Sequence, residues 1–517
     1  MAAPLASEEF PFPANICFPF WLRCHYTCTI LTTGIRIRHV KCDETHPNCM
    51  RCVNTGRRCD GYIRTKKPGR KQSGASSPDR SSALPTLPKF DDPRQKDFFG
   101  FFVISTSNAS SLYFGADFWS RRVLQLSLSE PSIRYALCSL SALHRMSTVS
   151  TPPHVTSIEF KNYSLQQYNH AVRCAQDLLA ESSDGSEDKI IKGLVTCVLF
   201  VCYENFIGNY KTAQMHLQSG LQIIAKEHLQ KKSVTIPDDI SQAFERLDLQ
   251  AMSFADSMAP YPYELCNNPR TFDPPLTPLV SFQDAIANVL YIFKWIFQAA
   301  ASWEPNPIPP EDLNSALLAL EELDLEIARF LALVSSKPSH ELRRRVTLLR
   351  MYQIVITTTI ATGVYGQETL HDDHLSKYEQ VVALGEELLR LTSSSSATST
   401  SQFFSFDIGA IAPLFMVAIN CREPQVRRRA VKLLASNDLQ EGSWKSIAAS
   451  KVAEFVIAIE EEGLRVGFGQ QQVPETARVH LVKVSTNIEK CEIRLSCLLR
   501  SSVDNSSWYI REGQVSY

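Results

Sequence analysis

The chain has 517 residues, of which 44% are hydrophobic and 21% charged, and its formal net charge is -1. This composition is ordinary for a folded globular protein and excludes a chain that is disordered throughout. The length allows a small N-terminal module together with one or two globular domains.

The charge is unevenly spread. Residues 1–72 contain 12 Lys and Arg against five Asp and Glu, a net of +7, which leaves -8 on the other 445 residues. A basic head on a mildly acidic body indicates a head that contacts a polyanion and a body that contacts other proteins.

The 15 cysteines do not have the distribution of a secreted disulfide scaffold. Seven lie within the first 59 residues, and the other eight are scattered through apolar stretches, where Cys acts as a small buried hydrophobe. We infer a reducing compartment. Residues 1–10 lack the early Lys or Arg of a signal peptide. The longest apolar runs, Gly193–Cys202 and Val289–Ala300, are too short to cross a bilayer, so we expect no membrane partner.

Three segments precede the body of the chain. Residues 1–35 are atypical, with a start rich in Phe and Pro and an uncharged β-branched run at Thr27–Thr33. Residues 36–62 form a basic cysteine module, and residues 63–95 have the composition of a linker. The linker opens with a basic cluster, which consists of Lys66, Lys67, Arg70 and Lys71. That cluster fits a nuclear-import signal and, equally, a solvated tail that adds phosphate contacts.

Helical periodicity begins near Phe98. Pro131 suits the first turn of a helix whose apolar residues, Ile133 to Leu143, recur at i, i+3 and i+4. Lys192–Tyr203 and Tyr210–Ile224 predict a helical hairpin with a break near Gly208. Further helices are expected at Glu311–Leu333, His340–Thr362, Ser376–Leu391, Val426–Ala435 and Ser446–Glu462.

The end of the chain, around Val479–Val484 and Cys491–Leu499, fits short strands as well as helix. The predicted fold class is mainly α. A small N-terminal cysteine module is joined by a flexible linker to a large all-helical domain over residues 96–517.

The cysteine module has the spacing that metal binding needs. Cys42, Cys49, Cys52 and Cys59 read C-x6-C-x2-C-x6-C. Thiolates so close in sequence can converge on one tetrahedral zinc ion, and metal binding then supplies the folding free energy of a module with little core. Basic residues lead into the first cysteine, and such side chains provide charge for DNA phosphates and donors for guanine edges. We therefore predict zinc as the cofactor and double-stranded DNA as a partner.

Residues 36–62 resemble the fungal Zn2Cys6 binuclear-cluster transcription factors. In that family six cysteines hold two zinc ions, and a short basic helix enters the major groove at CGG-type sites. The resemblance implies that Cys42, Cys49, Cys52 and Cys59 are the third to sixth ligands, with Cys49 as a bridge between the two ions.

The same resemblance assigns the DNA contacts. It implies that Lys41, next to the first cysteine, is the main base-reading residue. It also implies that Arg36, Arg38 and His39 mostly contact phosphates.

The first two ligands of the family pattern are missing, because positions 32 and 35 hold Thr32 and Ile35. Several explanations stay open. Cys24 and Cys28 replace the pair if Thr29–Gly34 loops out. Alternatively, residues near 17–35 come from an unspliced intron or a misplaced exon edge and do not belong to the functional protein. If the chain is correct as written, the four remaining cysteines hold one zinc ion, or DNA binding has been lost.

The body resembles the helical regulatory region of the same fungal factors over most of residues 98–465. Short segments carry this resemblance, among them Phe118-Trp119, Ser129–Arg134, Cys202–Glu204, Gly208–Tyr210, Asp407–Pro413, Cys421–Pro424, Glu441-Gly442 and Trp444. Proteins with this region are often tied to secondary-metabolite or nutrient genes.

Single polar residues of the body have simple structural interpretations. His144 and His216 are predicted to be core or helix-contact residues, Arg427–Arg429 a solvated helix face, and Glu460–Glu462 a surface run. Trp295 is predicted to lie in the core, and an effector site between helices stays open.

The predicted function is a nuclear, sequence-specific regulator of RNA polymerase II transcription, with co-regulators or the transcription machinery as further partners. The alternative is a helical regulatory or scaffold protein whose zinc module has decayed. The sequence has no P-loop, H-E-x-x-H or G-x-S-x-G motif, so we predict that it is not an enzyme. No heptad run follows the cysteines, which leaves monomeric binding or a homodimer through the helical body.

Overall fold

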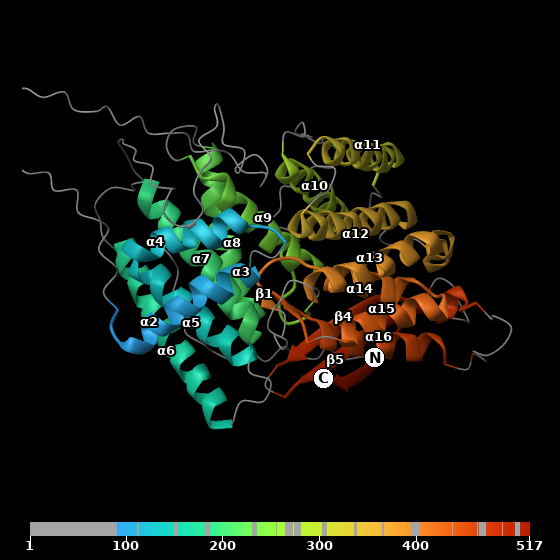
Figure 1. Ribbon diagram of the computed structural model, residues 1–517. Coiled ribbons are helices and arrows are strands. Elements are labelled where there is room, and N and C mark those ends of the chain that lie inside the picture. The colour runs from blue at the N-terminus through green and yellow to red at the C-terminus, as the bar shows by residue number, and fades with distance from the viewer. Residues whose placement is uncertain are drawn as a thin grey trace, which may run out of the picture.

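The structure is a computed structural model that describes residues 90–110, 113–148, 154–180, 187–229, 235–254, 256–263, 272, 281–301, 308–334, 339–363, 367–393, 404–436, 438–462, 464, 472–488, 490–501 and 507–517. Across these residues the chain is mainly α-helical, as predicted. Two groups of helices lie side by side, and a C-terminal sheet packs under the second (Figure 1).

The first group of helices spans residues 93–253. Its elements are α2 (Pro93–Phe101), the π-helix η1 (Phe102–Thr106), α3 (Ser107–Ser110), the π-helix η2 (Phe118–Arg122), α4 (Val123–Ser129), α5 (Pro131–Thr148), α6 (His154–Ala180), α7 (Glu187–Ile207), α8 (Tyr210–Leu229) and α9 (Asp238–Ser253). As predicted, α5 begins at Pro131. The apolar stripe of α5, which includes Ile133, Leu137 and Leu140, is buried in the core of this group.

Helices α7 and α8 form the predicted hairpin, which turns at Gly208 with φ = 79°. Only glycine adopts this conformation without strain, and a Cβ at Gly208 would also lie 2.1 Å from Ile488 Cδ1. By length and composition α7 could cross a membrane, but 56% of its most apolar window is buried inside the protein. Its apolar character is therefore explained by its central place between α5, α6 and α8.

The second group of helices spans residues 282–460. Its helices are α10 (Phe282–Ala301), α11 (Pro310–Val334), α12 (His340–Thr362), the 3-10 helix η4 (Glu368–His374), α13 (Leu375–Ser393), α14 (Ile411–Asn420), α15 (Pro424–Ser436) and α16 (Ser446–Glu460). The five helices predicted in this range are confirmed. Trp295 of α10 is buried against Phe272, in agreement with its predicted core position.

Two small sheets complete the fold. The first joins β1 (Phe404–Ser405), β2 (Gln440–Glu441) and β3 (Trp444–Lys445), with β1 parallel and β3 antiparallel to β2. The second follows the 3-10 helix η5 (Glu475–Ala477) and is an antiparallel meander of β4 (Val479–Asn487), β5 (Glu492–Arg500) and β6 (Trp508–Ser516).

The C-terminal meander corrects one part of the predicted fold, because the regulatory region is not helical throughout. In β5, alternate residues such as Ile493, Leu495 and Cys497 are buried. These side chains pack with Val452 and Val456 of α16. Residues that are alternately buried and more exposed fit the two-residue period of a strand and not the 3.6-residue period of a helix.

Two predictions about charged runs are wrong in part. Arg427 and Glu460, both expected at the surface, have side chains that are not exposed at all. They pair with each other across α15 and α16. The prediction holds for Arg428 and Arg429, whose side chains are exposed.

Candidate functional site

The predicted metal and DNA contacts lie outside the described residues. They are Cys42, Cys49, Cys52 and Cys59 for zinc, and Arg36, Arg38, His39 and Lys41 for DNA. The donor set suits one zinc ion, since four thiolates complete a tetrahedral site. A second ion needs ligands beyond these four. In the described part of the chain, no group of three or more His, Cys, Asp or Glu could hold a metal ion. The cysteines there, from Cys138 to Cys497, are free thiols.

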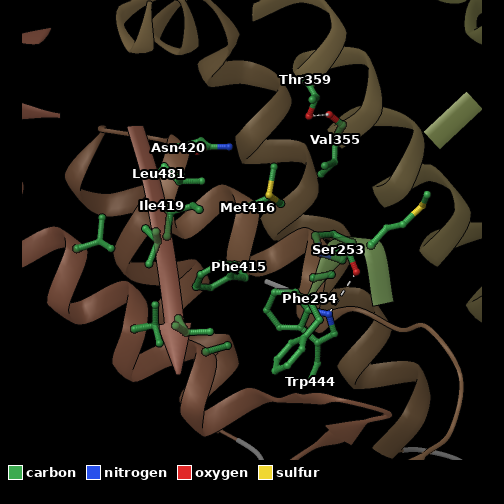
Figure 2. A pocket seen from close by; sticks show the side chains of 18 of the residues that line it. Ser253, Phe254, Val355, Thr359, Phe415, Met416, Ile419, Asn420, Trp444 and Leu481 are labelled. Carbon is green, nitrogen blue, oxygen red and sulfur yellow. Dashed lines mark hydrogen bonds between the residues drawn. The ribbon is translucent and has the colours of Figure 1, made fainter. Parts of the chain in front are cut away.

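The body contains a cavity of about 380 Å³ between the two groups of helices and the C-terminal sheet. Its walls come from the end of α9, from α10, α12, α14 and α16, and from β3 and β4. Figure 2 shows Phe415, Met416 and Ile419 of α14 on one side of this space, with Val355 and Thr359 of α12 on the other. A cavity of this volume matches the size of a site for a small organic molecule.

The wall of the cavity is mainly apolar and aromatic. The rings of Phe254 and Trp444 meet edge to face with centroids 5.5 Å apart, and Phe415 lies 5.3 Å from Trp444. The indole N–H of Trp444 donates to Ser253 Oγ at 3.4 Å, which fixes the ring (Figure 2). Tyr210 continues this aromatic cluster, 4.8 Å from Phe254.

Three polar side chains at the cavity lack a full set of partners among the described residues. The hydroxyl of Ser443, which is 4% exposed, has no hydrogen-bond partner there, and neither does the buried hydroxyl of Tyr517. The ammonium group of Lys445 lies 5.7 Å from the centroid of the Tyr517 ring. Within the described residues this ammonium forms no ion pair. Burial lowers the pKa of Lys445.

A second polar set reaches the cavity from η4 and β4. Burial, with a smaller contribution from the charge of Arg422, lowers the pKa of His371 to about 3, so that its imidazole is neutral. Glu368 is bound by Arg422 at 2.9 Å and faces His480 at 4.0 Å. Unlike the amine of Lys445, this carboxylate already has a strong cationic partner.

Behind this set lies a buried cluster of charges. The Glu460 carboxylate accepts from Arg422 and Arg427, each at 2.7 Å, and from the backbone N–H of Val479 at 2.9 Å. Burial alone would raise the pKa of Glu460, but the two guanidinium groups outweigh it, and the pKa is lowered. The cluster connects α15 and α16 to the start of the C-terminal sheet.

Two further acids are buried in the fold, and one of them, Asp407, connects the two groups of helices. Asp407 accepts from the guanidinium of Arg246 at 2.8 Å, with both side chains almost fully buried. The two Glu441 oxygens accept from the backbone N–H groups of Ala410 and Ile411 at the start of α14, each at 2.9 Å. Residues from the resemblance segments, such as Asp407 and Glu441, therefore stabilise the fold.

Two family models match parts of the chain. Residues 36–69 match the fungal Zn(2)-Cys(6) binuclear cluster domain, and residues 97–260 match the fungal specific transcription factor domain. These matches, together with the relatives below, support a fungal transcription factor of the Zn2Cys6 type. The zinc-cluster match begins at Arg36, so it includes the four predicted ligands and excludes Cys24 and Cys28.

Two similar proteins are regulators of transcription. This factor is 24% identical over 563 aligned positions to the aspercryptin biosynthesis cluster-specific transcription regulator atnN of Emericella nidulans, which covers 86% of this chain and 90% of that protein. It is 30% identical over 207 positions to the transcription regulator lscL of Purpureocillium lilacinum, which covers 38% of this chain and 48% of the other. No solved structure matches. These relatives agree with the prediction that the factor is not an enzyme.

The sequence left an effector site between helices open but did not locate the cavity. Its polar residues, Ser443, Lys445 and Tyr517, come from segments that meet only in the folded protein. The one available signal was the position of Ser443 between Gly442 and Trp444, two residues of the family resemblance. The prediction that His144 and His216 are core or helix-contact residues is confirmed. His144 is bound to Thr106 Oγ1 at 2.9 Å, and His216 packs on Phe200.

Proposed function

We propose that this factor acts in the nucleus, where its zinc module binds CGG-type DNA sites and controls the genes of a biosynthetic cluster. The observation that carries the proposal is the zinc-cluster match over residues 36–69, which begins with the basic residues Arg36 and Arg38. The Emericella relative is a cluster-specific regulator, which supports the choice of target genes. The basic cluster Lys66–Lys71 supports nuclear import.

The proposed division of labour follows the charge. Residues 36–62 bind DNA, and residues 96–517 form the regulatory body. Residues 63–95 link these two parts. The resemblance gives Lys41 the main base contact, while Arg36, Arg38 and His39 hold the phosphates. Co-regulators then bind the mildly acidic body, and a homodimer through that body would allow two half-sites to be read together.

A binding experiment with the full chain tests the proposal. A labelled duplex with a CGG pair is compared, by fluorescence anisotropy at two salt concentrations, with a duplex of the same length whose CGG triplets are scrambled. We expect tighter binding to the CGG duplex and weaker binding to both at high salt, because phosphate contacts release counterions. Equal affinity for the two duplexes would contradict sequence-specific reading. A fluorescent fusion in fungal cells tests the nuclear location.

The second candidate function, a regulator whose zinc module has decayed, is favoured by Thr32 and Ile35 at the first two ligand positions. Zinc analysis of the purified chain separates the two. Two ions per chain mean that Cys24 and Cys28, or residues absent from the sequence as written, complete the cluster. One ion means a mononuclear module, and none supports decay. Sequencing of the transcript decides whether residues near 17–35 are translated: a mature message that encodes Thr32 and Ile35 excludes the unspliced-intron explanation.

A further inference from the structure

The cavity of the regulatory body has features that a packing defect does not require. An empty space between helices is normally lined by apolar atoms alone. Here the buried hydroxyls of Ser443 and Tyr517 have no hydrogen-bond partner within the described structure. A buried polar group without a partner costs about 1–3 kcal/mol, so an arrangement with two of them around one cavity indicates a bound molecule that satisfies them.

The charge at this end of the cavity indicates the chemistry of that molecule. Lys445 contacts the electron-rich face of Tyr517, and in the described part of the chain no carboxylate forms an ion pair with its ammonium, although the charge of Asp438 acts on it from farther away. The acidic group of the cavity, Glu368, is bound by Arg422 at 2.9 Å and cannot neutralise Lys445. An anion on a ligand would supply both a counter-charge in direct contact with Lys445 and acceptors for the two hydroxyls.

The rest of the cavity wall indicates that most of the ligand is apolar. Phe254, Phe415 and Trp444 present aromatic surface, while Met416 and Ile419 add flexible and aliphatic surface opposite α12 (Figure 2). Aromatic and thioether side chains adapt well to flat or branched hydrocarbon ligands. The volume of about 380 Å³ limits the ligand to a small molecule.

We propose that this cavity binds a small, largely apolar organic acid, whose anionic group contacts Lys445, Ser443 and Tyr517. Such a ligand touches α9, α14, α16 and the end of the C-terminal sheet at once. Its binding therefore stabilises the attachment of the sheet to both groups of helices, because a ligand that binds only the folded state adds to its stability.

Two dyes with the same rings test the proposal on the full chain. The probe 8-anilinonaphthalene-1-sulfonate is aromatic and anionic, and N-phenyl-1-naphthylamine has the same skeleton without the sulfonate. We expect fluorescence titration to show that the wild type binds both dyes. Lys445→Met should weaken sulfonate binding about tenfold or more, as the loss of a charged hydrogen-bond partner predicts. It should leave the neutral dye nearly unchanged, and Lys445→Arg should restore the difference.

Matched variants distinguish the cavity from nonspecific binding. Lys451 lies on the exposed part of α16, where it pairs with Glu454, and Lys451→Met should change the affinity for neither dye. Ala448→Phe, which fills the cavity from α16, should abolish binding of both dyes. Ile419→Phe provides a second filling variant from α14 if the first unfolds, and cooperative thermal unfolding is the check on each variant.

Several results would overturn the proposal. Unchanged dye binding after the cavity has been filled would place the dyes elsewhere, and no binding to the wild type would exclude the site. An equal loss of both dyes in Lys445→Met, or an equal loss of the sulfonate in Lys451→Met, would exclude an anion site at Lys445.

Discussion

Arg427 of α15 and Glu460 of α16 form an ion pair of 2.7 Å in which neither side chain is exposed to solvent. Glu460 also binds Arg422 and the backbone of β4, so one carboxylate links three parts of the chain. Two guanidinium groups bind it, and among the described residues the other ion pair of Arg427 is a longer one with Glu461, at 3.8 Å. A buried charge that loses its partner is far more costly than an exposed one.

Glu460→Gln should therefore destabilise the protein by about 3–5 kcal/mol, because it leaves the charge of Arg427 buried without its main partner. The matched control is Glu454→Gln on the same helix, whose 2.8 Å pair with Lys451 is exposed on both sides. It should cost less than about 0.5 kcal/mol. Urea unfolding of the two variants measures the difference, and similar losses would show that burial of the pair does not matter.

Glu441→Gln tests the acid that caps α14. A glutamine cannot accept from the N–H groups of Ala410 and Ile411 at the same time, because one of its two head atoms is a donor. We expect a loss of about 1–3 kcal/mol near pH 5, measured by urea unfolding.

The pH dependence of this loss has a definite sign. Burial raises the pKa of Glu441 from 4.5 to about 7, so the folded state holds this proton more tightly than the unfolded chain. The contribution of Glu441 to stability therefore falls as the pH rises from about 4.5 to 7. The difference in unfolding free energy between wild type and Glu441→Gln should become smaller over this range. A difference that grows with pH would contradict the raised pKa.

His144 should give stability a pH dependence of the opposite sign. Burial lowers its pKa from 6.5 to about 4, so the unfolded chain binds the proton first as the pH falls. Stability is lost between about pH 6.5 and 4, by up to about 3 kcal/mol, since each pKa unit corresponds to 1.36 kcal/mol. His144→Asn, which keeps a polar group near Thr106, should flatten this part of the urea-unfolding profile.

Local signals predicted the helices well, because the information for a helix lies within its own segment. His340–Thr362 was predicted to the residue: Ser339 caps its first turn through a hydrogen bond of 3.1 Å, and Gly363 ends it with φ = 74°. The short apolar runs of β4 and β5 carry no such end signals. Their pairing with each other and with α16 decides their conformation.

Charged residues were harder to place than apolar ones. Arg427 and Arg429 look alike in the sequence. Arg427 is nevertheless buried in an ion pair with Glu460, 33 residues away, whereas Arg429 is exposed beside Glu386. The cavity could not be predicted from the sequence for the same reason, since Tyr210 and Tyr517 both line it and come from distant parts of the chain. The zinc ligands are the opposite case: four cysteines within 18 residues define a candidate site without any long-range information.

The base-reading role of Lys41 gives the last prediction. Lys41→Ala in the full chain should weaken binding to the CGG duplex by about 1–3 kcal/mol, while binding to the scrambled duplex changes little, because a base contact carries sequence information and a phosphate contact does not. Lys66→Ala in the linker is the matched control. It should weaken binding to both duplexes equally and reduce the salt dependence. Anisotropy titrations of the two variants make the comparison, and an equal loss on both duplexes for Lys41→Ala would assign that residue to the phosphates.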